Sequence, residues 1–338
     1  MVFGFAQHDG LDCEFAHVKL RHWLWVAFGT GLLIVGVNLV IFTVYPWVRW
    51  SEDFFPGRAP SDVLQPEAWT ATDDSLTFAV VGDTGSGGRN QMAVAQAMVD
   101  EYKVRPYPVV IHVGDVSYYG SIADRWREVW VEPYGSLLDA GVEFEVATGN
   151  HELEEELSAE ANEEIAQLIE RTKKQGAFYK TTYGPVDFFI IDSSTPLATG
   201  AAAQEQGEWL DRELGASTAR WKIAVHHHPP YGSGPKRGSN LPLREAVEPL
   251  YVEHGVDLVL TGHDHFYERT TPQQGVVYVI SGAGAKVSNT GEDANFTALT
   301  REGLQFMLIE VDGDTLRAQA LDENNVVFDD FTIVKDSS

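Results

Sequence analysis

The chain has 338 residues, an apolar content of 44% and a formal net charge of −26. This length allows a sizeable core, and the acidic excess argues against nucleic acid or an anionic membrane surface as the main partner, because both would be repelled. The single cysteine, Cys13, excludes an intramolecular disulfide and a thiolate metal site.

The N-terminal segment contains a long run without charge. Residues 23–48 have no charged side chain, and as a helix they would span roughly 39 Å, more than the roughly 30 Å of a hydrocarbon core. We therefore predict a tail at 1–22, a transmembrane helix at 23–48 and a linker at 49–75. A cleaved signal peptide is the alternative. Lys19 and Arg21 on the N-terminal side predict a cytoplasmic tail and an extracytoplasmic body, in the periplasm or at the cell surface.

Residues 76–335 are predicted to form one folded domain. Apolar β-type runs alternate with amphipathic helical patterns, and the last third is mostly strand-like. This order predicts an α/β fold with four layers, in which two packed mixed β-sheets are flanked by helices. The predicted strands are 76–81, 109–113, 142–147, 178–183, 186–191, 221–225, 256–260, 276–280, 305–311, 315–320 and 326–333. The predicted helices are 89–102, 126–138 with a possible kink at Pro133, 205–214 and 243–254.

Polar blocks follow five of these predicted strands. Because the carboxyl ends of parallel strands meet at one edge of a sheet, we expect the blocks to lie together. Two hard or borderline cations about 3.5 to 4 Å apart need a shared carboxylate, imidazoles and further oxygen ligands. The blocks supply such a set, and we predict a metal pair held by Asp83, Asp115, Tyr118, Asn150, His227, His263 and His265.

With Ser281–Gly284, these blocks resemble the calcineurin-like metallophosphoesterases over residues 76–284, and most closely the small, tartrate-resistant type of purple acid phosphatase. The wider superfamily begins its pattern with Asp-x-His, but Asp83-Thr84-Gly85 lacks the His, and Tyr118 stands where purple acid phosphatases place a Tyr. A tyrosinate oxygen suits a ferric ion. The resemblance implies two metal sites that share Asp115. Fe(III) would bind Asp83, Asp115, Tyr118 and His265, and a divalent ion (Fe, Zn or Mn) would bind Asp115, Asn150, His227 and His263.

The same resemblance implies an acid phosphatase-type hydrolase that cleaves small phosphate monoesters by in-line attack of a metal-bound hydroxide. His151 would protonate the leaving group or position the phosphate. His228 is the expected phosphate contact, although His226 remains open because strand alternation would put both on one face. The alternatives are a phosphodiesterase acting on cyclic nucleotides or glycerophosphodiesters, and a non-catalytic, membrane-tethered metal-binding protein.

Two further features receive structural interpretations. The acid-rich segment that begins at Glu152 is predicted to be a solvated helix start, because acidic side chains favour the first turns of a helix; a metal-recruiting surface is the alternative. His112, inside a predicted strand, is expected to be a core residue.

Overall fold

The computed structural model describes residues 57, 59–64, 72–119, 122–152, 176–194 and 201–336. The predicted transmembrane segment and tail lie outside these residues, as does the acid-rich segment after Glu152. Within the described ranges, no helix has both the length and the apolar character needed to cross a membrane. The predicted anchor therefore stays a prediction.

Two mixed sheets form the centre of the described fold. The six-stranded sheet has the order β13-β12-β11-β1-β2-β3, and the seven-stranded sheet has the order β10-β8-β9-β7-β6-β5-β4. The first sheet comprises β1 (Ser75–Val81), β2 (Val109–His112), β3 (Glu143–Val146), β11 (Phe306–Asp312), β12 (Thr315–Leu321) and β13 (Val327–Val334). The second comprises β4 (Tyr179–Tyr183), β5 (Val186–Ile190), β6 (Trp221–Val225), β7 (Leu258–Thr261), β8 (Tyr267–Thr270), β9 (Val277–Ser281) and β10 (Thr297–Arg301).

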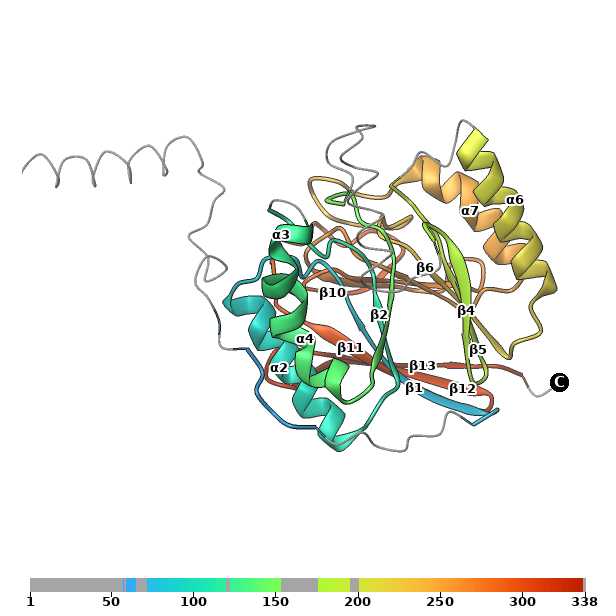
Figure 1. Cartoon of the computed structure of the whole chain (residues 1–338). Coiled ribbons are helices and arrows are strands. Elements are labelled where there is room, and N and C mark those ends of the chain that lie inside the picture. The colour runs from blue at the N-terminus through green and yellow to red at the C-terminus, as the bar shows by residue number, and fades with distance from the viewer. Residues whose placement is uncertain are drawn as a thin grey trace, which may run out of the picture. The chain divides into compact units, whose positions relative to one another are not determined.

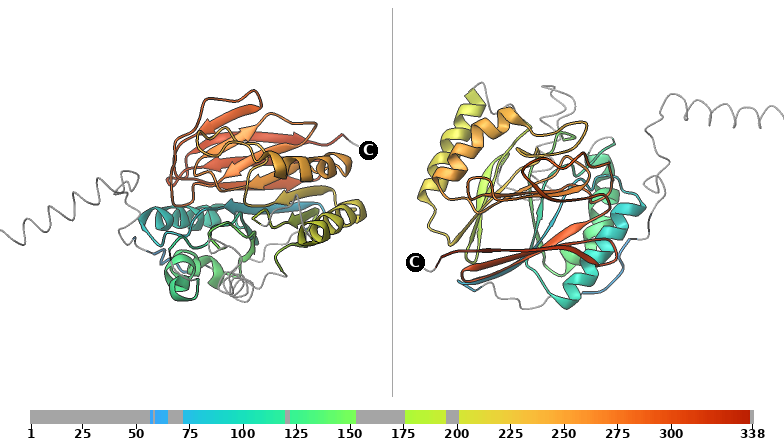
Figure 2. Two further views of the ribbon diagram at one scale, coloured as in Figure 1. Left: turned by 90° about the horizontal axis from the view of Figure 1, so that it is seen from above. Right: turned by 180° about the vertical axis from the view of Figure 1, so that it is seen from behind.

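Helices cover the outer face of each sheet (Figures 1 and 2). The first sheet packs against α2 (Arg89–Val104), α3 (Ile122–Trp126), the π-helical turn η2 (Arg127–Val131) and α4 (Glu132–Asp139). The second packs against α6 (Ala201–Ala216) and α7 (Leu241–Glu253).

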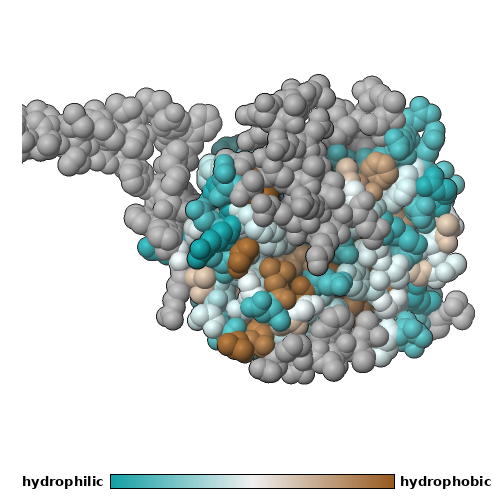
Figure 3. Space-filling model, in the orientation of Figure 1, coloured by the Kyte–Doolittle hydropathy of each residue, from teal (hydrophilic) through white to brown (hydrophobic). Residues whose placement is uncertain are grey.

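Strand alternation explains the layers. In β1, Phe78 and Val80 face the second sheet and pack in the core between the sheets. Ala79 and Val81 face the other way and pack with residues of α2. The predicted α/β fold with two mixed sheets and flanking helices is thereby confirmed in the described residues. On the face drawn in Figure 3, hydrophilic areas and several apolar areas are interspersed.

The structure differs from the predicted elements in one helix and in two additional strands. The helix predicted at 126–138 is a succession of α3, η2 and α4, and Pro133 lies in the first turn of α4, directly after the π-helical turn. Strands β8 and β10 had not been predicted.

The register of the parallel strands aligns their carboxyl ends, from which the polar blocks continue. Val81 of β1 pairs with His112 of β2, which in turn pairs with Val146 of β3. In the second sheet, Val225 of β6 pairs with Leu260 of β7. The segments that follow these strands therefore begin side by side.

Candidate metal centre

Three of the predicted ligands meet beyond the end of β1. The hydroxyl oxygen of Tyr118 lies 3.3 Å from Oδ1 of Asp83 and 3.2 Å from Nε2 of His265. The same imidazole nitrogen lies 3.4 Å from Oδ1 of Asp83. Asp83 and Tyr118 are buried, and His265 is partly exposed. We call these three side chains the tyrosine half of the site.

Three other predicted ligands form a second cluster, which we call the amide half. Oδ1 of Asn150 lies 3.2 Å from Nε2 of His227 and 2.8 Å from Nδ1 of His263, and these two nitrogens are 3.2 Å apart. Nδ1 of His227 lies 2.9 Å from the carbonyl oxygen of Val113. Because a carbonyl only accepts hydrogen bonds, Nδ1 carries a hydrogen, and Nε2 is the nitrogen that can take up either a proton or a cation.

Asp115 lies between the two halves. Its Oδ1 is 3.3 Å from Nε2 of His227 and accepts the backbone N–H of His151 at 3.0 Å. Ligand atoms of Asp115, Asp83 and His265 all lie within 4.8 Å of one another. One carboxylate is thus placed to reach a cation in either half.

The donor atoms present fit a pair of cations. Two ligand atoms that bind one cation at about 2.0 to 2.3 Å lie roughly 3 to 3.5 Å apart, which agrees with the separations in both halves. In the amide half, the carbonyl oxygen of Asn150 and ring nitrogens of two imidazoles face one another. Such atoms repel unless a cation or a proton lies between them.

Asp115 and His227 each stabilise the charged form of the other. Burial opposes ionisation of Asp115, but the charge of His227 and its hydrogen bond outweigh burial and hold the pKa of that carboxyl well below its usual range. Burial also lowers the pKa of His227, yet the carboxylates of Asp115 and Asp83 raise it to about 9. A bound cation would replace the proton on His227 as the partner of Asp115.

Tyr118 would need a cation in order to ionise here. Burial raises the pKa of its phenol well above the usual value, and the negative charges of Asp83 and Asp115 raise it further. A phenolate at this position is therefore stable only beside a strong positive charge.

The backbone that carries the ligands is unusual at three positions. Asp83 and Asp115 both have φ of +57°, and His263 has φ of +70°. This left-handed conformation is uncommon for residues with a side chain. Glycines allow close approach nearby, since a Cβ on Gly149 would collide with Oδ1 of Asp115 and one on Gly262 with Oδ2 of Asp83.

The prediction that Glu152 is solvated is wrong, because this residue is only 2% exposed. Its carboxylate accepts the backbone N–H groups of Gly149 at 2.7 Å and of Asp115, Val116 and Ser117 at 3.2, 2.8 and 3.3 Å. Burial, aided by the charge of Asp115, raises its pKa to about 7. Glu152 thus ties the segment after β2 to the segment after β3. Its position directly after Asn150-His151 is the feature of the sequence that could have indicated that Glu152 supports the site.

The two histidines that flank His227 have different surroundings. Strand β6 ends at Val225, so the alternation expected for His226 and His228 does not apply. His226 is fully buried, and its ring stacks on Tyr251 of α7 with centroids 6.3 Å apart. The ring of His228 instead lies against that of His263, with centroids 4.3 Å apart.

Ser193 fixes the orientation of His228 and was not singled out from the sequence. Its Oγ accepts the backbone N–H of His228 at 2.9 Å and lies 3.1 Å from Nδ1 of the same ring. Burial, together with the charge of His227, lowers the pKa of His228 to about 3. Ser193 follows β5 closely, so its place just after an apolar strand was the signal that could have found it.

The remaining predicted site residues are also accounted for. Nε2 of His151 is 3.9 Å from Oδ2 of Asp115, and its ring makes a T-shaped contact with that of Tyr118, with centroids 4.8 Å apart. His112 is fully buried, which confirms the core interpretation, and its Nε2 lies 2.9 Å from Oγ1 of Thr84.

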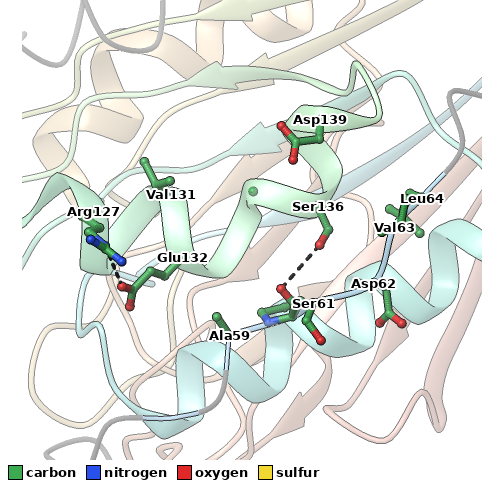
Figure 4. Close-up of a pocket in the computed structure, with 12 residues that line it drawn as sticks. Ala59, Ser61, Asp62, Val63, Leu64, Arg127, Val131, Glu132, Ser136 and Asp139 are labelled. Atoms are coloured by element: carbon green, nitrogen blue, oxygen red, sulfur yellow. Dashed lines mark hydrogen bonds and ion pairs between the residues drawn. The ribbon is translucent and has the colours of Figure 1, made fainter.

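A cavity of about 750 Å³ lies between residues 59–64 and the helical segments η2 and α4 (Figure 4). Ser136 donates a hydrogen bond of 3.5 Å to the carbonyl of Pro60 across it, and Arg127 forms an ion pair of 3.0 Å with Glu132 (Figure 4). None of the seven predicted ligands lines this cavity, so the cavity is separate from the candidate metal centre.

Comparison with known proteins agrees with the geometry. Residues 76–267 match the family model described as calcineurin-like phosphoesterase. The chain is 26% identical to purple acid phosphatase 17 of Arabidopsis thaliana over 239 residues, which cover 64% of this chain and 70% of that protein. It is 24% identical to tartrate-resistant acid phosphatase type 5 of Homo sapiens over 252 residues, which cover 66% of this chain and 77% of that protein.

A similar fold occurs in purple acid phosphatase PPD1 from yellow lupin seeds, with a TM-score of 0.67 and 19% identity. The match covers 79% of this chain and 55% of the lupin protein, so this chain corresponds to little more than half of that protein's length. The matched family model extends over more than half of the chain, which confirms the predicted resemblance. The chain therefore belongs to the calcineurin-like phosphoesterase family, as a metal-dependent phosphoesterase with distant homology to purple acid phosphatases and tartrate-resistant acid phosphatase.

Proposed function

We propose that this chain hydrolyses phosphate monoesters with an Fe(III) ion and a divalent ion. The observation that carries the proposal is the contact of the Tyr118 hydroxyl with both Asp83 and His265. A phenolate among a carboxylate and an imidazole is a hard, strongly donating ligand, which favours a ferric ion.

The two halves of the site divide the ligands. Fe(III) would bind the tyrosine half, and the divalent ion, Fe, Zn or Mn, would bind the amide half. Asp115 would serve both, which its contact with His227 and its proximity to Asp83 support. When bound, the metal pair would supply Lewis acidity that activates water and polarises the ester.

His228 is proposed to hold a phosphate oxygen. A hydroxyl has one hydrogen, and because Ser193 Oγ accepts the backbone N–H of His228, that hydrogen can be donated to Nδ1 of the ring. Nε2 then carries the ring hydrogen and can donate it to phosphate. His226 is the weaker candidate because its ring is buried against Tyr251.

His151 is proposed to donate the proton that the leaving alkoxide needs. Its position supports this role, since it lies beside Asp115 and packs nearly perpendicular to the ring of Tyr118 without being one of the seven predicted ligands. Replacement of His151 by Ala should slow poor leaving groups more than good ones. Equal losses across a series of substituted phenyl phosphates would assign the proton transfer to another group.

The test of the metal assignment is elemental analysis of the purified protein together with its visible spectrum. Wild-type protein should hold two metals, one of them iron, and show a tyrosinate-to-iron absorption band. Tyr118→Phe should lose this band and keep its circular dichroism, whereas Tyr119→Phe, the matched control next to it, should keep the band. Full wild-type activity without iron would contradict the Fe(III) assignment.

The proposed location is a single-pass membrane protein with its N-terminus in the cytoplasm and its catalytic domain outside. The uncharged run at 23–48 and the preceding Lys19 and Arg21 support it. Protease added to intact cells should remove the domain. If the domain stays uncut while a known surface protein is cleaved, the orientation is wrong.

A further inference from the structure

One imidazole in the core connects the turns after β1 and β2, which carry Asp83 and Asp115. The N–H of Gly114 donates to Nδ1 of His112 at 3.2 Å, and Nε2 of the same ring lies 2.9 Å from Oγ1 of Thr84. Thr84 directly follows Asp83, and Gly114 directly precedes Asp115. His112 and Thr84 are fully buried, so water does not compete for these contacts.

The direction of both hydrogen bonds follows from the backbone donor. An N–H group only donates, so Nδ1 of His112 is the acceptor and carries no hydrogen. The ring hydrogen is therefore on Nε2 and is donated to the hydroxyl of Thr84. Burial lowers the pKa of His112 to about 3, which agrees with a neutral ring. The imidazole thus accepts from one turn and donates to the other.

The same two turns are also joined through their main chains. The N–H of Asp83 donates to the carbonyl of Gly114 at 2.9 Å, and the N–H of Gly85 donates to that of Asp115 at 3.1 Å. Asp83 and Asp115 have a left-handed backbone, which persists only where the surrounding structure holds it. His112 adds a side-chain contact next to each of these two residues.

These contacts concern one half of the metal centre more than the other. The turns joined by His112 carry three of the four expected ferric ligands, namely Asp83, Asp115 and Tyr118. The amide half takes its ligands from the segments after β3, β6 and β7. A change in the spacing of the two turns should therefore weaken the tyrosine half first.

We propose that His112 is a positioning residue that sets the spacing of Asp83 and Asp115 for the ferric ion. It acts through Thr84 on one turn and Gly114 on the other, and it binds no metal itself. This inference rests on the proposed metal assignment and gives a core histidine a role in metal selectivity.

The test compares Thr84→Val with Thr84→Ser in the full chain. Valine has nearly the shape of threonine but leaves the Nε2 hydrogen of His112 without an acceptor, whereas serine keeps the hydroxyl. His112→Phe keeps a planar ring and removes both hydrogen bonds. The control is Thr270→Val in β8 of the second sheet, which removes a buried hydroxyl that accepts the N–H of Tyr278 at 3.0 Å.

Metal-free protein is titrated with Fe(III) citrate while the tyrosinate-to-iron band is recorded, and the iron-loaded protein is then titrated with zinc by calorimetry. Thr84→Val and His112→Phe should bind iron about 10-fold more weakly, as is typical when groups that orient metal ligands are removed, and should shift the band. Zinc affinity should change much less. Thr84→Ser should keep both affinities, and Thr270→Val should lower the Tm without changing either.

Several outcomes would overturn the inference. These are equal losses of iron and zinc affinity, unchanged iron affinity in Thr84→Val, or equally weak iron binding in Thr84→Ser. Weaker iron binding in Thr270→Val would do the same, because iron affinity would then follow overall stability. The Thr84 pair decides the matter if His112→Phe does not fold.

Failure of the proposed function gives a different result. Wild-type protein would then form the tyrosinate-to-iron band but hydrolyse no phosphate ester, and the two titrations would still test His112. Wild-type protein that forms no band would overturn the ferric assignment and this inference together.

Discussion

The two sheets contribute different chemistry to the candidate metal centre. Segments after β1, β2 and β3 of the first sheet carry the oxygen ligands, namely Asp83, Asp115, Tyr118 and Asn150. Segments after β6 and β7 of the second sheet carry the nitrogen ligands, namely His227, His263 and His265. Neither sheet alone has the mixed ligand set that each metal would need.

This division makes the site dependent on the packing of one sheet against the other. The core between the sheets includes Phe78 and Val80 of β1 and Ile223 and Val225 of β6. These strands end beside the candidate site, so the same packing that buries apolar side chains also aligns the two ligand groups. Cations that bind ligands from both sheets should in turn hold the sheets together.

The largest expected effect comes from Asp115, the carboxylate that lies between the two halves of the site. Asp115→Asn should lower activity by about 10³-fold or more, since a catalytic metal pair is worth several kcal/mol to the transition state. Metal content should fall below two per chain by elemental analysis. Asp139→Asn, on the surface of α4, is the control. Two retained metals in Asp115→Asn would remove Asp115 from the bridging position.

The second-largest effect is expected from metal removal, which tests whether bound cations hold the two sheets together. Ligands that bind only the folded state stabilise it by about 2.7 kcal/mol when their concentration is about 100 times Kd. For a domain of this size, that corresponds to about 5 to 10 °C in Tm. A chelator should lower the Tm of wild-type protein by this amount and barely change that of Asp115→Asn. An equal shift in both proteins would show that the cations stabilise another part of the fold.

Glu152 tests whether the oxygen ligands depend on support from within their own sheet. Glu152→Gln places an amide group among backbone N–H donors and should cost about 1 to 3 kcal/mol of stability. Metal affinity should fall about 10- to 100-fold, as is typical for residues that orient ligands. Denaturant unfolding and metal titration measure the two effects, with exposed Glu205→Gln as the control. Unchanged metal affinity would leave Glu152 with a structural role only.

The smallest effect is expected at Ser193, which supports a histidine of the second sheet that is not a ligand. Ser193→Ala removes one hydrogen bond worth about 1 kcal/mol and should weaken inorganic phosphate binding by about fivefold, with metal content unchanged. Ser193→Thr keeps the hydroxyl and should restore binding, and Ser194→Ala is the neighbouring control. If Ser193→Ala binds phosphate normally, the hydroxyl does not set the orientation of His228.

The order of elements and the position of the ligands were predictable because both depend on local signals. Apolar runs such as 76–81 and 109–113 mark buried parallel strands, and the carboxyl ends of such strands share one edge of a sheet. The seven predicted ligands therefore come together in the structure. The strand predicted at 142–147 is present as β3 within one residue at each end.

Features that depend on contacts between distant segments were not predictable. Strand β8 contains Glu268, a charged residue that is unusual in a buried strand, and its carboxylate accepts hydrogen bonds from Ser233 and Thr297. Glu152 is similar, since its burial is offset by N–H groups from another loop. The return of β11 to pair with β1 depends on the whole chain, and no local pattern indicates it.

The left-handed backbone at Asp83, Asp115 and His263 has a consequence for how such a chain would evolve. A left-handed residue with a side chain costs about 1 to 2 kcal/mol relative to glycine. Were metal binding no longer under selection, glycine at these positions would be favoured on stability alone, and inactive descendants would become more stable.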